Sequence, residues 1–147
     1  MFILKSVRLS LMKIDKRLVD SAITLMETRF PRGQGGAAAM YTEDGEILTS
    51  IGVENQLNDS ANLCHETGAI LEALKLGKRI TASVCVFRET ETKQILILTP
   101  CGICQERLMP FGDNLEVAVP KKSDPTQWES KTLKEVQPYY WGKVFKK

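Results

Sequence analysis

Two segments of the chain indicate its fold and its chemistry: Leu63–Gly68, with the sequence LCHETG, and Thr99–Gln105, with the sequence TPCGICQ. The first is predicted to begin a helix over 63–76, and the second to join a strand over 94–98 to a helix over 101–108. Both segments therefore place cysteines at the start of a helix, where free N–H groups and the helix dipole favour the thiolate over the thiol. Because metal ions bind the thiolate, both segments are candidates for one metal site.

Three cysteines are candidate zinc ligands. Cys101 and Cys104 share the first turn of one predicted helix, and Cys64 lies at the start of another. Zinc prefers four tetrahedral ligands, so a structural site would need one more. His65 adjoins Cys64 in the chain and cannot easily chelate beside it, whereas Cys85 lies in an apolar strand, where a small buried side chain is expected. If the two helices converge, the site has three protein ligands and an open position, which describes a catalytic zinc.

Glu66 is the candidate catalytic residue beside this zinc site. A zinc ion lowers the pKa of water in its open position, and a neighbouring carboxylate is suited to collecting the proton. In a regular helix, residues two apart point in different directions, so Cys64 and Glu66 can share a site only if the helix aims its end at the metal.

The rest of the chain predicts helices interleaved with strands. Apolar periodicity and turn signals indicate helices over 15–29, 63–76, 101–108 and 133–139, and strands over 36–41, 46–51, 81–87, 94–98 and 115–119. The 63–76 helix should bury a stripe that includes Leu63, Ala69, Ile70, Ala73 and Leu74. We therefore expect an α/β fold, a three-layer α-β-α sandwich around a mixed, roughly five-stranded sheet, because hairpin-joined strands argue against a purely parallel one.

Length and composition indicate a single soluble domain with one site. The chain has 147 residues, 43% of them hydrophobic, and a net charge of only +2 with interspersed charges, so nucleic acid is not an expected partner. No apolar stretch approaches the roughly 20 residues that a membrane-spanning helix needs, so a membrane is not expected either. We expect residues 1–12 to form an N-terminal extension and residues 13–147 to form the domain. Four cysteines without a secretory signal point to the cytoplasm.

The paired motifs resemble those of the zinc deaminases of bases and nucleosides, a class marked by a Glu near one ligand and by Pro-Cys-x-x-Cys. The resemblance runs from about Asp15 to Trp141 and includes the segments Gly36–Ala38, Thr42–Gly45 and Thr132–Tyr139. The all-cysteine ligand set is similar to that of the small homotetrameric cytidine deaminases and the blasticidin S deaminases.

This resemblance implies a cytidine deaminase-like fold and hydrolytic removal of the exocyclic amine of a cytosine nucleoside. It implies that Glu66 takes a proton from the zinc water, passes it to ring N3 and then protonates the departing ammonia, while hydroxide adds to C4. It also implies a homo-oligomer, a tetramer or a dimer, and a role in pyrimidine salvage. The substrates to consider are cytidine, deoxycytidine and a blasticidin S-like analogue.

The sequence departs from the family's pattern at the nucleoside pocket. Family members carry a Phe before the Gly-Ala-Ala stretch, whereas this chain has Arg32–Gly35 there, so we expect that pocket wall to be missing. The family's ribose-binding Asn-x-Glu has a partial counterpart in Val53-Glu54-Asn55, which makes Glu54 and Asn55 the candidate substrate-binding residues.

Two further departures lie beside the catalytic residue. The Arg that commonly follows the catalytic Glu is Thr67 here, so thiolate charge would be compensated from elsewhere, with Arg107 as a candidate. His65 replaces a usually small residue, and we interpret it as a packing or surface variant.

Three alternatives remain open at the level of sequence. Cys101-Gly102-Ile103-Cys104 alone is a thiol-redox motif, although redox chemistry would leave Cys64 and Glu66 unexplained. The chain could instead be a structural zinc protein, or a deaminase relative that keeps the metal site without turnover.

Overall fold

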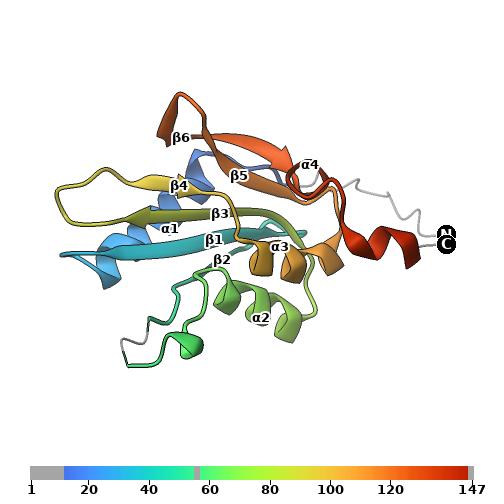
Figure 1. Cartoon of the computed structure of the whole chain (residues 1–147), viewed down its shortest axis with the longest axis horizontal. Helices are drawn as coiled ribbons and strands as arrows, with labels where there is room; N and C mark the ends of the chain where they lie inside the picture. The colour runs from blue at the N-terminus through green and yellow to red at the C-terminus, as the bar shows by residue number, and fades with distance from the viewer. Residues whose placement is uncertain (1–11, 55–56, 146–147) are drawn as a thin grey trace, which may run out of the picture.

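Helices and strands alternate along the chain (Figure 1), and the structure, a computed structural model, describes residues 12–54 and 57–145. The expected N-terminal extension therefore lies outside the described residues, apart from Met12. The elements are α1 (Lys16–Arg29), β1 (Gly35–Thr42), β2 (Ile47–Ser50), η1 (Asp59–Ala61), α2 (Thr67–Leu76), β3 (Ile80–Arg88), β4 (Leu96–Leu98), α3 (Gly102–Leu108), η2 (Met109–Phe111), β5 (Glu116–Lys121), β6 (Asp124–Thr132), α4 (Leu133–Val136) and η3 (Trp141–Phe145).

The sheet has six strands and is mixed. Its order is β2-β1-β3-β5-β6, with β4 also paired to β3. Only the β3–β5 pair is parallel. Strand β3 pairs with β4 at Cys85–Phe87 and with β5 at Ala82–Ser83, so its partner changes just beside Cys85. The chain leaving β4 at Leu98 must turn out of the sheet there, and this turn carries it into α3.

Helices cover both faces of the sheet, which confirms the expected three-layer sandwich (Figure 1). On one face α1 packs on Ala37, Ala39 and Tyr41 of β1 and on Ala82, Val84 and Val86 of β3. On the other face α2 and α3 pack on a second cluster, which includes Met40, Ile80 and Val117. Because strand side chains alternate between faces, the alternate residues of β1 and β3 lie on the α2–α3 side.

A polar contact fixes α1 on the sheet. Asp15 caps the helix by accepting a hydrogen bond from the backbone N–H of Leu18, at 2.9 Å. Its carboxylate also accepts a hydrogen bond from the hydroxyl of Tyr41 in β1, at 2.9 Å. Among the described residues, no helix has the length and apolar character needed to cross a bilayer.

Four expectations about the elements need correction. The sheet has a sixth strand, β6, which was missed because Asp124–Thr132 is polar and contains a proline. Helix α2 begins at Thr67 rather than at residue 63, because Leu63 pairs with Val53 in a β-bridge and residues 65–66 form a turn. The predicted stripe is therefore only partly buried, since Leu63 and Leu74 are exposed. The last helix is also shorter than expected and ends at Val136.

Candidate metal centre and active site

Small side chains on the sheet leave room for a site beneath α2 and α3. On that face, Gly36 pairs with Phe87, and Ala38 pairs with Cys85. Gly36 and Ala38 supply the small side chains, and on β3 Cys85 and Phe87 alternate with the fully buried Val84 and Val86, which face α1 instead. The sheet side chains beneath the segment before α2 and the start of α3, which we call the floor of the site, therefore include small ones at Gly36 and Ala38.

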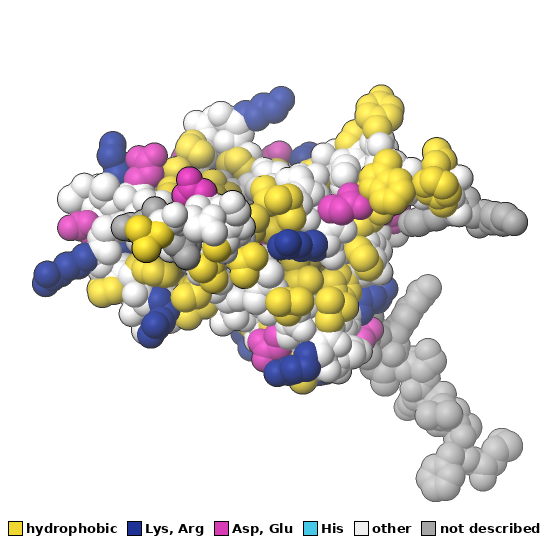
Figure 2. All heavy atoms as spheres, turned by 60° about the horizontal axis from the view of Figure 1, so that its bottom comes forward, with side chains coloured by type: hydrophobic (Ala, Val, Ile, Leu, Met, Phe, Trp, Pro, Cys, Tyr) yellow, Lys and Arg dark blue, Asp and Glu magenta, His cyan; other side chains and the backbone are white. Residues whose placement is uncertain are grey.

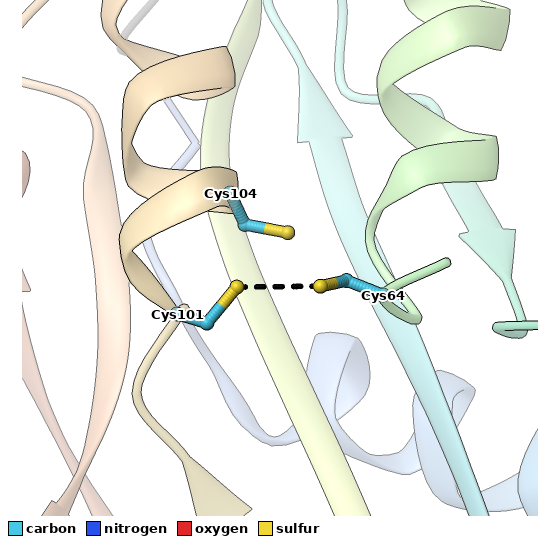
Figure 3. Close-up of side chains that lie close together, drawn as sticks. All are labelled: Cys64, Cys101 and Cys104. Carbon is cyan, nitrogen blue, oxygen red and sulfur yellow. Dashed lines mark hydrogen bonds between the residues drawn. The ribbon is translucent and has the colours of Figure 1, made fainter. Parts of the chain in front are cut away.

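The three predicted ligands converge above this floor (Figure 3). The sulfur atoms of Cys64, Cys101 and Cys104 lie within 4.8 Å of one another, and those of Cys64 and Cys101 are 3.3 Å apart. Cys101 is the N-cap of α3, and Cys104 lies in the first turn of that helix. Cys64 comes from the turn before α2 rather than from the helix itself. Sulfurs bound to one tetrahedral zinc at about 2.3 Å are about 3.8 Å apart, so the trio has suitable spacing for this metal.

The start of α3 favours a negative charge on Cys101. Partial burial acts to raise the pKa of its thiol, but hydrogen bonds from backbone N–H groups and from the neighbouring thiols lower it below the ordinary value. The pKa values of the other two thiols are raised, in both cases chiefly by burial, with the charge of Glu66 contributing. This difference agrees with the expectation that free N–H groups at a helix start stabilise a thiolate.

Glu66 is buried beside the cysteines. Its side chain is 3% exposed, and the Sγ of Cys104 lies 3.5 Å from its Oε2. No lysine or arginine within the described part of the chain forms an ion pair with it. A buried carboxylate without a cationic neighbour is costly, so a divalent cation held by the adjacent thiols would suit this position.

A cavity of about 310 Å³ opens at His65, a ring nitrogen of which lies within 4.8 Å of a carboxylate oxygen of Glu66. It is lined by Phe30, Gln34, Gly35, Gly36, Ile51, Gly52, Glu54 and His65. Its size is at the lower end of the range for small-molecule pockets, and it combines apolar walls with a few polar groups, as such pockets do.

The cavity changes two interpretations made from sequence. Phe30 provides an aromatic wall, so the expectation that this wall is missing is wrong; the ring comes from the end of α1 and packs over Gly35. Of the two interpretations of His65, packing holds and a surface position does not, because the residue is half-buried, packs against Gly36 and lines the same cavity. Glu54 also lines the cavity and is exposed, whereas Asn55 lies outside the described residues.

Within the described part of the chain, Arg107 forms no hydrogen bond with the cysteines. Its Nη1 instead donates a hydrogen bond to the hydroxyl of Thr67, at 2.9 Å. Thr67 directly follows Glu66 and begins α2. The guanidinium therefore links α3 to the start of α2 and holds together the two segments that carry the candidate ligands.

The chain is similar to known cytidine deaminases, although no protein-family model matches it. A crystal structure of the cytidine deaminase from Bacillus anthracis is 43% identical, with a TM-score of 0.81 over 88% of this chain and 91% of that one. A probable cytidine deaminase from Dictyostelium discoideum is 31% identical over 97 residues, which span 66% of this chain and 62% of that relative. The cytidine deaminase from Mycobacterium tuberculosis, at 22% identity and a TM-score of 0.63 over 88% of this chain and 98% of that one, shares the fold.

Proposed function

The chain belongs to the cytidine deaminase family, and we propose that it is a zinc-dependent hydrolase that converts a cytosine nucleoside to the uracil form with release of ammonia. One observation carries the proposal: three thiols and a buried carboxylate converge, and His65 beside that carboxylate lines a cavity of small-molecule size. A redox pair of Cys101 and Cys104 would need neither the third thiol nor Glu66.

We propose that Cys64, Cys101 and Cys104 hold the zinc ion. When bound, this ion would supply Lewis acidity that makes water a nucleophile at neutral pH. The three thiols come from two segments, so the fold must bring them together before they can act as one ligand set. Their sulfur spacing and the pKa of Cys101, lowered despite partial burial, support this assignment.

We propose that Glu66 carries the protons of the reaction. Its Oε2 would accept a proton from the attacking water, deliver it to ring N3 of the pyrimidine and then assist the departure of ammonia. Burial away from bulk water suits a group that must pass a proton between two bound partners. The remainder of the nucleoside would occupy the adjacent cavity, where Glu54 is the proposed sugar-binding residue and Asn55 is proposed to assist it.

We further propose that the chain works as a homo-oligomer, a tetramer or a dimer. The outer face of α2 exposes apolar side chains, since Leu71 is 59% exposed and Leu74 is 58% exposed. Together with Leu63 and Ile70 they line a shallow hollow of about 340 Å³. Figure 2, which turns the α2 side toward the viewer, shows hydrophobic side chains gathered on this face. Contiguous exposed apolar side chains mark interaction surfaces.

The substrate and the setting of the reaction are also proposals. Cytidine and deoxycytidine are the expected substrates, with a blasticidin S-like analogue as an alternative, and cytoplasmic pyrimidine salvage is the expected role.

The test measures ammonia released from cytidine, deoxycytidine, cytosine and blasticidin S by the purified protein, with its zinc content determined in parallel. We expect one zinc per chain and release from at least one nucleoside, which stops after chelation and returns with zinc. Zinc at one per chain without release from any of these compounds would contradict the proposal and favour an inactive zinc-binding relative. Thiol-disulfide exchange in the absence of zinc would favour the redox alternative.

A further inference from the structure

The ring of His65 occupies a space that two glycines leave open. A Cβ atom on Gly36 would lie 2.5 Å from Nε2 of His65, and one on Gly52 would lie 3.2 Å from its Cδ2. Non-bonded atoms do not approach as closely as the first of these distances, so a side chain at Gly36 would displace the ring. A glycine within a strand commonly marks a close approach of this kind. The imidazole is therefore built into the cavity wall rather than projecting into solvent.

The two ring nitrogens of His65 have different surroundings. Nδ1 lies 3.8 Å from the Sγ of Cys85, below it on the sheet. Nε2, over Gly36 at the cavity wall, has no hydrogen-bond partner within residues 12–54 and 57–145. The backbone carbonyl of His65 accepts a hydrogen bond from the hydroxyl of Ser50, at 2.5 Å, which fixes the turn that carries the ring. One polar atom is thus held at the cavity without a partner.

This position joins the candidate catalytic residue to the cavity. A ring nitrogen of His65, a carboxylate oxygen of Glu66 and the sulfur of Cys85 lie within 4.8 Å of one another. The cavity beyond the ring is lined by the polar side chains of Gln34 and Glu54. Because His65 lies next to Glu66 and lines the cavity, a nucleoside whose base reaches Glu66 and whose sugar occupies the cavity would pass close to the imidazole.

We propose that His65 is a specificity-determining residue, whose Nε2 hydrogen-bonds a hydroxyl on the sugar of the nucleoside substrate. This inference rests on the proposed function, because it assumes that a nucleoside binds with its base at Glu66. A site that hydrogen-bonds a hydroxyl discriminates against the analogue without it, since the buried partner then stays unsatisfied. The substrate class is accordingly a nucleoside with its hydroxyls in place, rather than a free base.

The test removes one hydroxyl at a time from the substrate. The kcat/KM values of cytidine and of its 2′-deoxy, 3′-deoxy and 5′-deoxy analogues are measured with the zinc-loaded wild type and with His65→Ala. We expect one analogue to be about tenfold worse than cytidine for the wild type, as for the loss of one neutral hydrogen bond. With His65→Ala this difference should disappear, while the ratios for the other analogues stay unchanged.

Matched variants separate this role from a structural one. The side-chain amide of Gln reaches close to the position of Nε2, whereas that of Asn reaches only as far as Nδ1. His65→Gln should therefore restore part of the lost discrimination, and His65→Asn should not. Gly36→Ala should displace the ring and reduce the same discrimination, yet add no further effect in the His65→Ala background, as expected when two residues act through one contact.

The outcomes are distinct for the two proposals. Unchanged ratios across the panel with His65→Ala, or with Gly36→Ala if the first variant does not fold, would overturn the role of His65 and leave the deaminase assignment intact. A zinc-loaded wild type that deaminates none of the nucleosides would overturn the proposed function and this inference with it. Zinc content and binding of uridine by calorimetry, measured for each variant, distinguish a lost substrate contact from a lost metal ion.

Discussion

Replacing Glu66 with Gln is the most direct perturbation of the proposed chemistry. The change keeps the volume of the side chain and removes no ion pair that the described residues form. Because the residue is 3% exposed, a neutral amide is less costly to bury there than a carboxylate. We therefore expect the free energy of unfolding to change by less than about 1 kcal/mol, or to rise.

The expected loss lies in turnover. General acid–base catalysis by a positioned side chain contributes about 100-fold to 10,000-fold to the rate. This range corresponds to about 3–5 kcal/mol of activation free energy. An amide cannot shuttle protons, so kcat for the best nucleoside substrate should fall by that factor, with zinc still at one per chain. Ammonia release, metal analysis and a thermal melt on the same preparation measure the three quantities.

The matched control is Glu72→Gln, which makes the same chemical change at an exposed position on α2. It should leave turnover unchanged. If Glu66→Gln retained zinc and worked within about threefold of the wild type, proton transfer by this residue would be refuted. If the variant lost its zinc, Glu66 would instead support the metal centre.

Other predictions concern the metal, the oligomer and the fold. Cys104→Ser should lower zinc well below one per chain by metal analysis, whereas Cys85→Ser should retain it; equal zinc in both variants would contradict the ligand assignment. Paired Leu71→Glu and Leu74→Glu substitutions should shift the protein toward the monomer in analytical ultracentrifugation with little change in circular dichroism, and an unchanged oligomer would place the interface elsewhere. Tyr41→Phe removes a hydrogen bond to the carboxylate that caps α1 and should lower the free energy of unfolding in urea by about 1–2 kcal/mol, whereas an unchanged midpoint would show that this bond contributes nothing net.

Local spacing explains why the candidate ligands could be predicted from sequence. Cys101 and Cys104 are three residues apart and share the first turn of a short helix, so their proximity depends on local geometry alone. Cys64 is distant in the sequence, and its place beside Cys101 and Cys104 could be inferred only because two cysteines are too few ligands for a zinc ion. The roles of all three in binding zinc stay predictions.

The cavity could not be predicted, because its residues meet through tertiary structure. Phe30 comes from the end of a helix, and its ring packs over Gly35 only after the chain turns into β1. The environment of His65 depends on Gly36 and Gly52, which precede it by different distances in the sequence. A signal was nevertheless present, since adjacent glycines at the start of an otherwise apolar strand suggest that another group approaches closely.

The polar character of β6 hid the sixth strand. A strand at the edge of a sheet has one open side and needs few apolar residues, so hydrophobic alternation is a weak signal there. Trp128 is only partly buried, although it packs on the core beneath α1. The edge strand lies two strands away from the site, and missing it left the predicted position of the chemistry unchanged.

The register of β1 against β3 links the whole fold to the site. The pairing places Ala38 opposite Cys85 and Gly36 opposite Phe87, and it turns the small side chains toward α2 and α3. A slip of one residue in β3 would move every side chain of that strand to the opposite face. Val84 and Val86 would then stand beneath the cysteines, in the space where His65 and Glu66 now approach the sheet. The metal site and the cavity therefore depend on the same strand register that forms the core beneath α1, so binding of zinc should be coupled to folding of the whole chain.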